Sequence, residues 1–102
     1  MRAKVLRNLR MAREYLSGKK LRVIAEENNI SIPDVDNAIK RIYTQLIPSI
    51  ERLQYLTPKS IVLDYRDKLT TILDKRIKEE ETKEEVIDAF VHAIKEDLKN
   101  ST

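Results

Sequence analysis

Eight side chains of this sequence have the types and the spacing that suit contact with nucleic acid. They are Lys19, Lys20, Arg22, Ser31, Ile32, Asn37, Lys40 and Arg41. Lysine and arginine pair with backbone phosphates, and an asparagine amide can bond two atoms of an adenine edge at once. The same charges also suit an ordinary solvated helix face, so both interpretations are open at the level of composition.

Positive charge is concentrated at the beginning of the chain. The first 22 residues hold eight lysines and arginines against a single acid, whereas residues 51–102 hold ten against twelve aspartates and glutamates. The whole chain of 102 residues has a net charge of +3. A basic front and a slightly acidic back indicate that the front meets phosphate.

Residues for catalysis or metal binding are scarce. The sequence has no cysteine, His92 is the only histidine and Gly18 is the only glycine. A phosphate-cradling loop needs several glycines, a metal site needs several ligands, and a nucleophilic triad needs a histidine beside its serine. We expect His92 to lie on the polar side of the last helix. The sequence therefore predicts a protein that is not an enzyme and has no cofactor or metal.

The sequence gives no sign of export or of a membrane span. No run approaches the ~18 apolar residues that a transmembrane helix needs, and the first 20 residues lack the apolar stretch of a signal peptide. The absence of cysteine suits a reducing compartment. We expect a cytoplasmic protein without membrane contact, in the cytoplasm of the host cell if the protein is viral.

Helix signals dominate the rest of the sequence, because glycine and proline are rare. The expected helices cover residues 2–16, 20–28, 32 to about 47, 50–56, 58–78 and 83–99. Ser31 and Thr57 are typical N-caps, each with a proline in the following turn. Residues 79–81 are expected to break the chain between helices, and Thr82 to open a capping box with Glu85.

Apolar residues recur at steps of three and four along these helices. In the first helix the expected inward stripe is Val5, Leu6, Leu9, Ala12, Tyr15 and Leu16. The fold class is all-α, with a three-helix helix-turn-helix domain over residues 1–47 and two or three amphipathic helices over residues 48–102. The two parts are either separate or one continuous domain.

The segment from Leu21 to Leu46 has the landmarks of a helix-turn-helix. Ala25 is small enough for two helices to cross closely, and Asn29 stands where a turn often has glycine. Ile30 fills the gap between the helices, Ser31 caps the next helix, and apolar residues further on fasten that helix to the core. Its outer face is then free to enter a major groove ~12 Å wide.

The stretch LRVIAEENNISIPDVDNAIKRIYTQL resembles the helix-turn-helix of sigma factor region 4 and its relatives, which include response-regulator output domains. The resemblance covers residues 19–46, about a quarter of the chain. It rests on Ile24-Ala25, on Ile30-Ser31, and on Val35 and Ile39. It implies a transcription subunit that binds the flap of core RNA polymerase and promoter DNA, like the small bacteriophage proteins that resemble one sigma region.

The face that would read DNA departs from the family pattern. Sigma region 4 usually carries arginine and glutamine or acidic residues there, whereas this chain has Ile32, Pro33, Asp34, Asp36 and Asn37. The two aspartates would repel phosphate or serve only as partners of the helix dipole. Asn37 remains a candidate base reader, and Lys40 and Arg41 are the better phosphate contacts.

Three functions stay open at this stage. The first is the sigma-like factor, with double-stranded DNA and RNA polymerase as partners. The second is a free-standing repressor or activator that dimerises through its C-terminal helices and reads two half-sites. The third is a helical adaptor that binds only protein. The last helix, with Phe90 at its centre, is the piece we expect to bind a partner, either a second copy or a second phage subunit.

Overall fold

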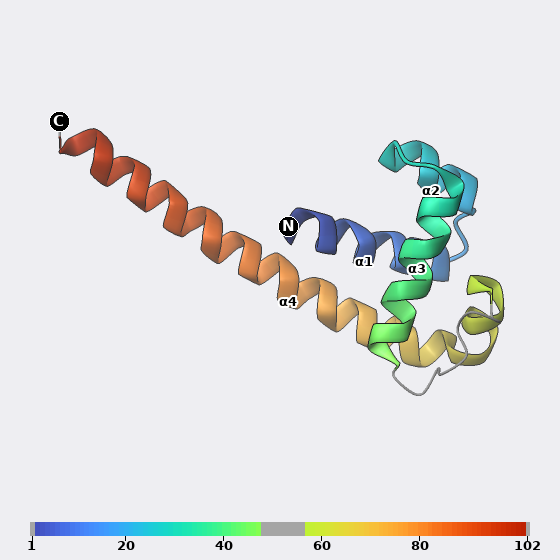
Figure 1. Cartoon of the computed structure of the whole chain (residues 1–102). Helices are drawn as coiled ribbons and strands as arrows, with labels where there is room; N and C mark the ends of the chain where they lie inside the picture. Colours follow the sequence, from blue (N-terminus) through green and yellow to red (C-terminus); the bar gives the residue numbers. More distant parts are fainter. Residues whose placement is uncertain (1, 48–56, 102) are drawn as a thin grey trace.

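The computed structural model describes residues 2–47 and 57–101, and within them helices joined by short turns are the only regular secondary structure (Figure 1). Four helices follow one another: α1 (Arg2–Leu16), α2 (Leu21–Asn28), α3 (Ile32–Leu46) and α4 (Pro58–Asn100). The helix expected over residues 50–56 lies outside the described residues. The molecule is elongated, with extents of 59 × 27 × 21 Å, because α4 projects beyond the other helices.

The first two helices are separated where the sequence has its only glycine. Gly18 has a φ of 106°. This backbone conformation is unfavourable for every residue that has a Cβ atom. Ser17 Oγ donates a hydrogen bond of 2.8 Å to the Glu14 carbonyl at the end of α1. The chain then turns through Lys20, whose extended backbone precedes the first residue of α2.

A turn of three residues joins α2 to α3. Asn29 ends α2 in the left-handed conformation, with a φ of 59°, and the Ile30 N–H donates to the Ala25 carbonyl at 3.1 Å. Ser31 then caps α3, because its Oγ accepts the Asp34 N–H at 3.2 Å. The expected roles of Asn29 and Ser31 as turn residue and N-cap are thus confirmed.

The expected break after residue 78 is wrong, since α4 runs without interruption from Pro58 to Asn100. Thr82 is not an N-cap, because its Oγ1 donates back to the Lys78 carbonyl at 2.9 Å inside the helix. Glutamate is a good helix former, so a run of three does not stop a helix as proline or glycine would. Glu80 is also paired with Arg76 at 3.3 Å and with Lys83 at 3.4 Å. These pairs lie one turn apart and support the helix.

One hydrophobic core joins all four helices. Its most buried members include Leu9, Leu16, Ile24, Tyr43 and Leu73. Helix α4 contributes Ile61, Val62, Leu69 and Leu73 to this core from its first half. The boundary expected between residues 47 and 48 stays a prediction, although the core includes residues on both sides of it.

Helix α1 lies against α4 in the opposite direction. Arg13 pairs with Asp74 at 2.7 Å, and Arg10, one turn earlier in α1, pairs with Glu81, two turns later in α4. The expected inward stripe of α1 is wrong at Val5, which is 40% exposed, and it omitted Met11, which is buried. The N-terminal turn of α1 lies near the edge of the packed region, where α4 continues alone (Figure 1).

No helix in the described part of the chain is both long and apolar enough to cross a membrane.

Candidate nucleic-acid interface

Helix α3 has one face in the core and the opposite face open. Val35, Ile39, Ile42 and Tyr43 are buried, and the helical step of about 100° per residue places Asn37 on the other side. Asn37 is exposed. The inner face fixes the helix on the core, so the outer face is presented on a rigid support.

Asn37 and Arg41 lie beside the beginning of α1. With Lys4 and Arg7 of that helix they line a hollow of about 550 Å³ between α1 and α3. Arg41 and Lys4 are exposed, and no ion pair within the described residues involves either of them. Arg7 donates to the Asn8 side chain at 3.1 and 3.3 Å. Three cationic side chains therefore share this hollow with the Asn37 amide, while the Asn8 amide is held by Arg7.

Lys40 differs from Arg41, although the two are adjacent in the sequence. Lys40 Nζ lies 3.0 Å from Asp36 Oδ2, and both side chains are about 30% exposed or less. This pair spans one turn of α3, which is the favourable spacing for opposite charges. Asp36 therefore offsets the charge of Lys40, whereas no carboxylate of the described residues forms an ion pair with Arg41.

The other residues expected to contact DNA from the beginning of α3 are Ser31 and Ile32. Ser31 is exposed, but its hydroxyl oxygen already accepts the Asp34 N–H as a cap. Ile32 is 45% exposed, so an apolar side chain stands at the tip of the helix. Asp34 is exposed on the rim of the hollow that contains Asn37. One uncompensated acid thus lies close to the open face.

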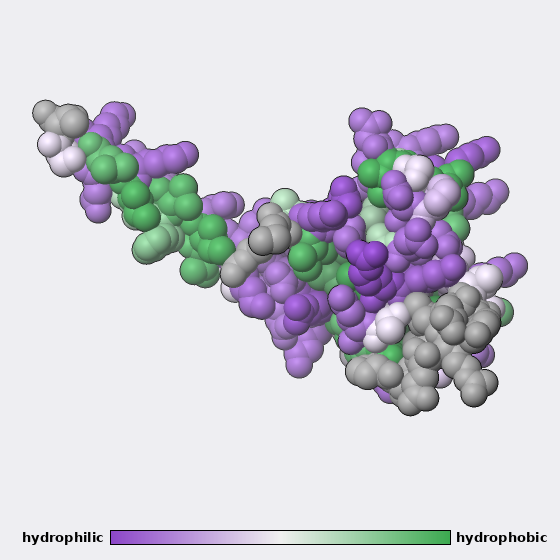
Figure 2. Space-filling view, in the orientation of Figure 1, coloured by the Kyte–Doolittle hydropathy of each residue, from purple (hydrophilic) through white to green (hydrophobic). Residues whose placement is uncertain are grey.

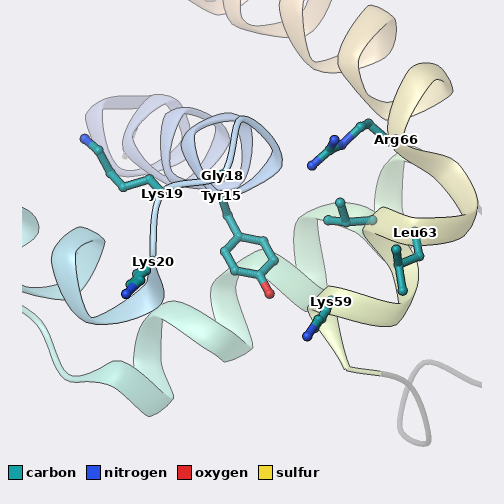
Figure 3. Close-up of a pocket in the computed structure, with 8 residues that line it drawn as sticks. Tyr15, Gly18, Lys19, Lys20, Lys59, Leu63 and Arg66 are labelled. Carbon is teal, nitrogen blue, oxygen red and sulfur yellow. The ribbon is translucent and has the colours of Figure 1, made fainter.

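A second group of basic residues surrounds a pocket at the junction of α1, α2 and α4 (Figure 3). The pocket has a volume of about 430 Å³, and Tyr15 forms its inner wall. Its basic lining residues are Lys19, Lys20, Lys59 and Arg66. Lys59 and Arg66 come from the first turns of α4, roughly 40 to 47 residues after the two other lysines, and were not among the residues expected from the sequence.

The lysines of this pocket are not equivalent. Lys19 Nζ lies 2.8 Å from Glu27 Oε2 and 3.5 Å from Glu14 Oε2. The hydrogen bond to Glu27 raises the pKa of Lys19 above its usual value, and both carboxylates add to the effect. Lys20 is exposed, and no ion pair in residues 2–47 or 57–101 involves it. The charge available to a phosphate here comes from Lys20 with the two cations of α4.

Four of the expected DNA-contact residues therefore line two separate hollows, and residues of α3 line only the first of them. Asn37 and Arg41 open towards the α1 side, and Lys19 and Lys20 open towards the α4 side. Arg22 is exposed in the first turn of α2.

No protein-family model, curated protein or solved structure matches this chain.

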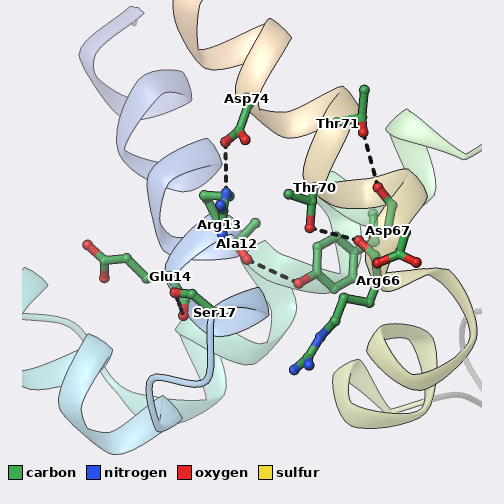
Figure 4. A network of polar contacts seen from close by, with 10 residues as sticks. Ala12, Arg13, Glu14, Ser17, Arg66, Asp67, Thr70, Thr71 and Asp74 are labelled. Atoms are coloured by element: carbon green, nitrogen blue, oxygen red, sulfur yellow. Dashed lines mark hydrogen bonds and ion pairs between the residues drawn. The ribbon is translucent and has the colours of Figure 1, made fainter.

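Tyr43 fastens α3 to α1 beneath this surface. Its side chain is fully buried, and its hydroxyl donates to the Ala12 carbonyl at 3.1 Å (Figure 4). Burial raises the pKa of Tyr43 far above its usual value, because the phenolate would lose its hydration. The pKa of Tyr15 is raised as well, first by burial and then by the charge of Asp36. Tyr43 lies within the core, whereas Tyr15 is only partly buried against it.

His92 is exposed on α4, as the sequence predicted. In the ranges that the structure describes, no three histidine or acidic side chains gather closely enough to hold a metal ion.

Proposed function

We propose that this protein is a transcription factor that places α3 in the major groove of double-stranded DNA. The observation that carries the proposal is the outer face of α3, where exposed Asn37 lies beside Arg41 and the basic beginning of α1. An asparagine can bond the N6 and N7 positions of adenine together, and unpaired cations can hold the phosphates on either side of the groove.

The connection between α2 and α3 supports the helix-turn-helix assignment. The turn has three residues, its first residue is left-handed, and Ile30 packs against the core from within it. Ala25 is buried at the position where the second helix must approach the third. Each of these features is what a helix-turn-helix needs to hold its recognition helix away from the body of the domain.

The resemblance of residues 19–46 to sigma factor region 4 supports a second part of the proposal. The chain would also bind core RNA polymerase at the flap and bring α3 to promoter DNA. DNA binding by the chain alone would then be weak and salt-sensitive, because one candidate base reader is accompanied by many phosphate contacts.

The experiment for the first part is titration of a labelled DNA duplex with the purified chain, followed by fluorescence anisotropy. The double variant Lys40→Glu with Arg41→Glu should abolish measurable binding at 0.1 M salt. The matched control is Lys75→Glu with Lys78→Glu, two exposed lysines of α4 that make the same change in charge. Equal loss in both variants would show that only total charge matters and would contradict groove binding by α3.

The second part needs a different measurement, because DNA can bridge two proteins. A tagged chain would be recovered from the extract of its own host after nuclease treatment. RNA polymerase subunits in the eluate would support the sigma-like role. Their absence, with DNA binding intact, would leave a free-standing regulator.

The free-standing regulator is a second candidate because of one observation. Helix α4 ends in a long apolar stripe from Val86 to Leu98 that no described residue of the body covers. A DNA-binding repressor or activator of this size commonly works as a dimer. The third possibility, an adaptor that binds only protein, is favoured by exposed Asp34, and it predicts no DNA binding in the titration above.

A further inference from the structure

The end of α4 carries large apolar side chains in solvent. Every residue from Glu85 to Ser101 is exposed. The apolar stripe consists of Val86, Ile87, Phe90, Val91, Ile94 and Leu98, and three of these are about two thirds exposed. Figure 2 shows the stripe as a continuous hydrophobic band along the projecting helix. A patch of this length on one helix face is typical of an interaction surface.

This stripe continues a face of α4 that is buried closer to the body. Leu73, Glu80, Ile87 and Ile94 follow one another at steps of seven residues and therefore share one side of the helix. Leu73 and Glu80 are buried, whereas Ile87 and Ile94 are 40% and 44% exposed. The face that packs against the body up to Glu80 is thus bare beyond it. An isolated helical end of this length is only marginally stable in water without a partner.

The charges along one edge of the stripe indicate what covers it. Asp88 lies on this edge near the body, and Lys95 lies on the same edge two turns further out. A helix with acid at one end of an edge and base at the other is complementary to a copy of itself that runs in the opposite direction. Nucleic acid is a poor occupant, because residues 79–100 hold eight acids against three lysines.

We propose that the Val86–Leu98 stripe is a self-association surface on which α4 of a second copy docks antiparallel. Ile87 then faces Leu98 of the partner subunit, and Val91 faces Ile94 of the partner subunit. The same register places Asp88 beside Lys95 of the partner subunit, and the symmetry of the dimer repeats each contact.

The antiparallel direction of the two helices follows from Glu84. This residue lies three positions before Ile87 and continues the seam, the line of contact formed by Ile87, Val91, Ile94 and Leu98. A parallel pair would place the two copies of Glu84 opposite each other within the seam, and like charges there are unfavourable. In the antiparallel register Glu84 faces Ser101 of the partner subunit instead. The two bodies then lie at opposite ends of the shared helices and do not compete for space.

Sedimentation velocity of the full chain over a hundredfold range of concentration tests the proposal. A concentration-dependent dimer is expected, and Ile94→Asp should weaken it at least tenfold. His92→Asp is the matched control, because His92 lies on the side of α4 away from the stripe. A chain that is monomeric at every concentration, or a dimer that Ile94→Asp leaves unchanged, would overturn the proposal. Circular dichroism would show that both variants keep their helix content.

Charge reversal tests the direction of the two helices. Asp88→Lys places two lysines opposite each other, and Lys95→Asp places two aspartates opposite each other, so each variant alone should dimerise more weakly than the natural chain. A mixture of the two variants should restore the dimer, because every facing pair is again of opposite sign. Failure of the mixture to recover would exclude the antiparallel register. Both measurements are made without DNA, so they are independent of the proposed DNA contact.

Discussion

Arg41 and Lys40 are adjacent, yet the structure predicts opposite behaviour for them in DNA binding. Arg41 has no carboxylate partner among the described residues, whereas Lys40 Nζ is 3.0 Å from Asp36 Oδ2. We expect Arg41→Ala to weaken the binding of duplex DNA clearly. We expect Lys40→Ala to change it little, because the variant removes a charge that Asp36 already offsets.

The magnitude follows from counterion release. Each phosphate that a protein neutralises contributes about −0.9 to the slope of log K against log salt concentration. Loss of the Arg41 contact should therefore make the slope less steep by about 0.9. If the two affinities are equal at 1 M salt, this change of slope makes the binding of the variant roughly eightfold weaker than that of the natural chain at 0.1 M salt.

Asp36→Asn gives the converse test of the same pair. This variant removes the acid that occupies Lys40 and leaves the lysine available to a phosphate. Affinity for duplex DNA should rise, by up to about eightfold at 0.1 M salt, and the salt slope should become steeper by about 0.9. The effect should disappear when Asp36→Asn is combined with Lys40→Ala.

Fluorescence anisotropy with one duplex at salt concentrations from 50 to 200 mM measures all of these variants. Lys75→Ala is the control for loss of a charge far from α3. The reasoning would be refuted if Lys40→Ala weakened binding as much as Arg41→Ala, since the Asp36 pair would then have no influence. It would also be refuted if all three alanine variants were alike.

Two predictions concern the support of α3. Tyr43→Phe should lower the free energy of unfolding by about 1 kcal/mol in urea titrations at neutral pH, because it removes the buried hydrogen bond to the Ala12 carbonyl. The pKa of Tyr43 is raised in the folded state, so the unfolded chain loses this proton first; stability should be fully present below about pH 10 and fall as the pH rises beyond it. Tyr43→Phe should make this alkaline decline shallower, and an unchanged decline would exclude Tyr43 as its source. Asn29→Val should cost about 1–2 kcal/mol, because a β-branched residue is strained at a φ of 59°, whereas Asn29→Gly should be nearly neutral. Equal stability of both Asn29 variants by thermal unfolding would show that the turn is not held in this conformation.

Local signals in the sequence were sufficient for most of the secondary structure. The N-caps at Ser31 and Thr57, the left-handed turn at Asn29 and the limits of α1 could be predicted, because each depends on residues within one or two turns. The continuity of α4 was missed for a related reason. A cluster of glutamates resembles a break in composition, but nothing in it removes a backbone hydrogen bond or forbids the helical conformation.

The candidate site was predicted only in part. The outer face of α3 could be found from its helical period, and Asn37 and Arg41 are exposed on it. The hollow with Lys4 and Arg7 and the pocket with Lys59 and Arg66 could not be found, because they depend on how α1 and α4 pack on the core. No spacing in the sequence relates residues about 40 positions apart.

The sequence by itself determined that the chain is helical, where the helices of its first half begin and end, and which faces are apolar. Those properties arise from backbone conformation and from periodicity, which are local. Only the tertiary structure decided which cations keep their charge for a ligand and which apolar stripe stays uncovered. Asp74 of α4 pairs with Arg13 of α1, Glu27 of α2 pairs with Lys19 of the preceding turn, and the body of the protein ends before α4 does. Pairing and burial depend on distances between segments, and these distances exist only after the helices have packed.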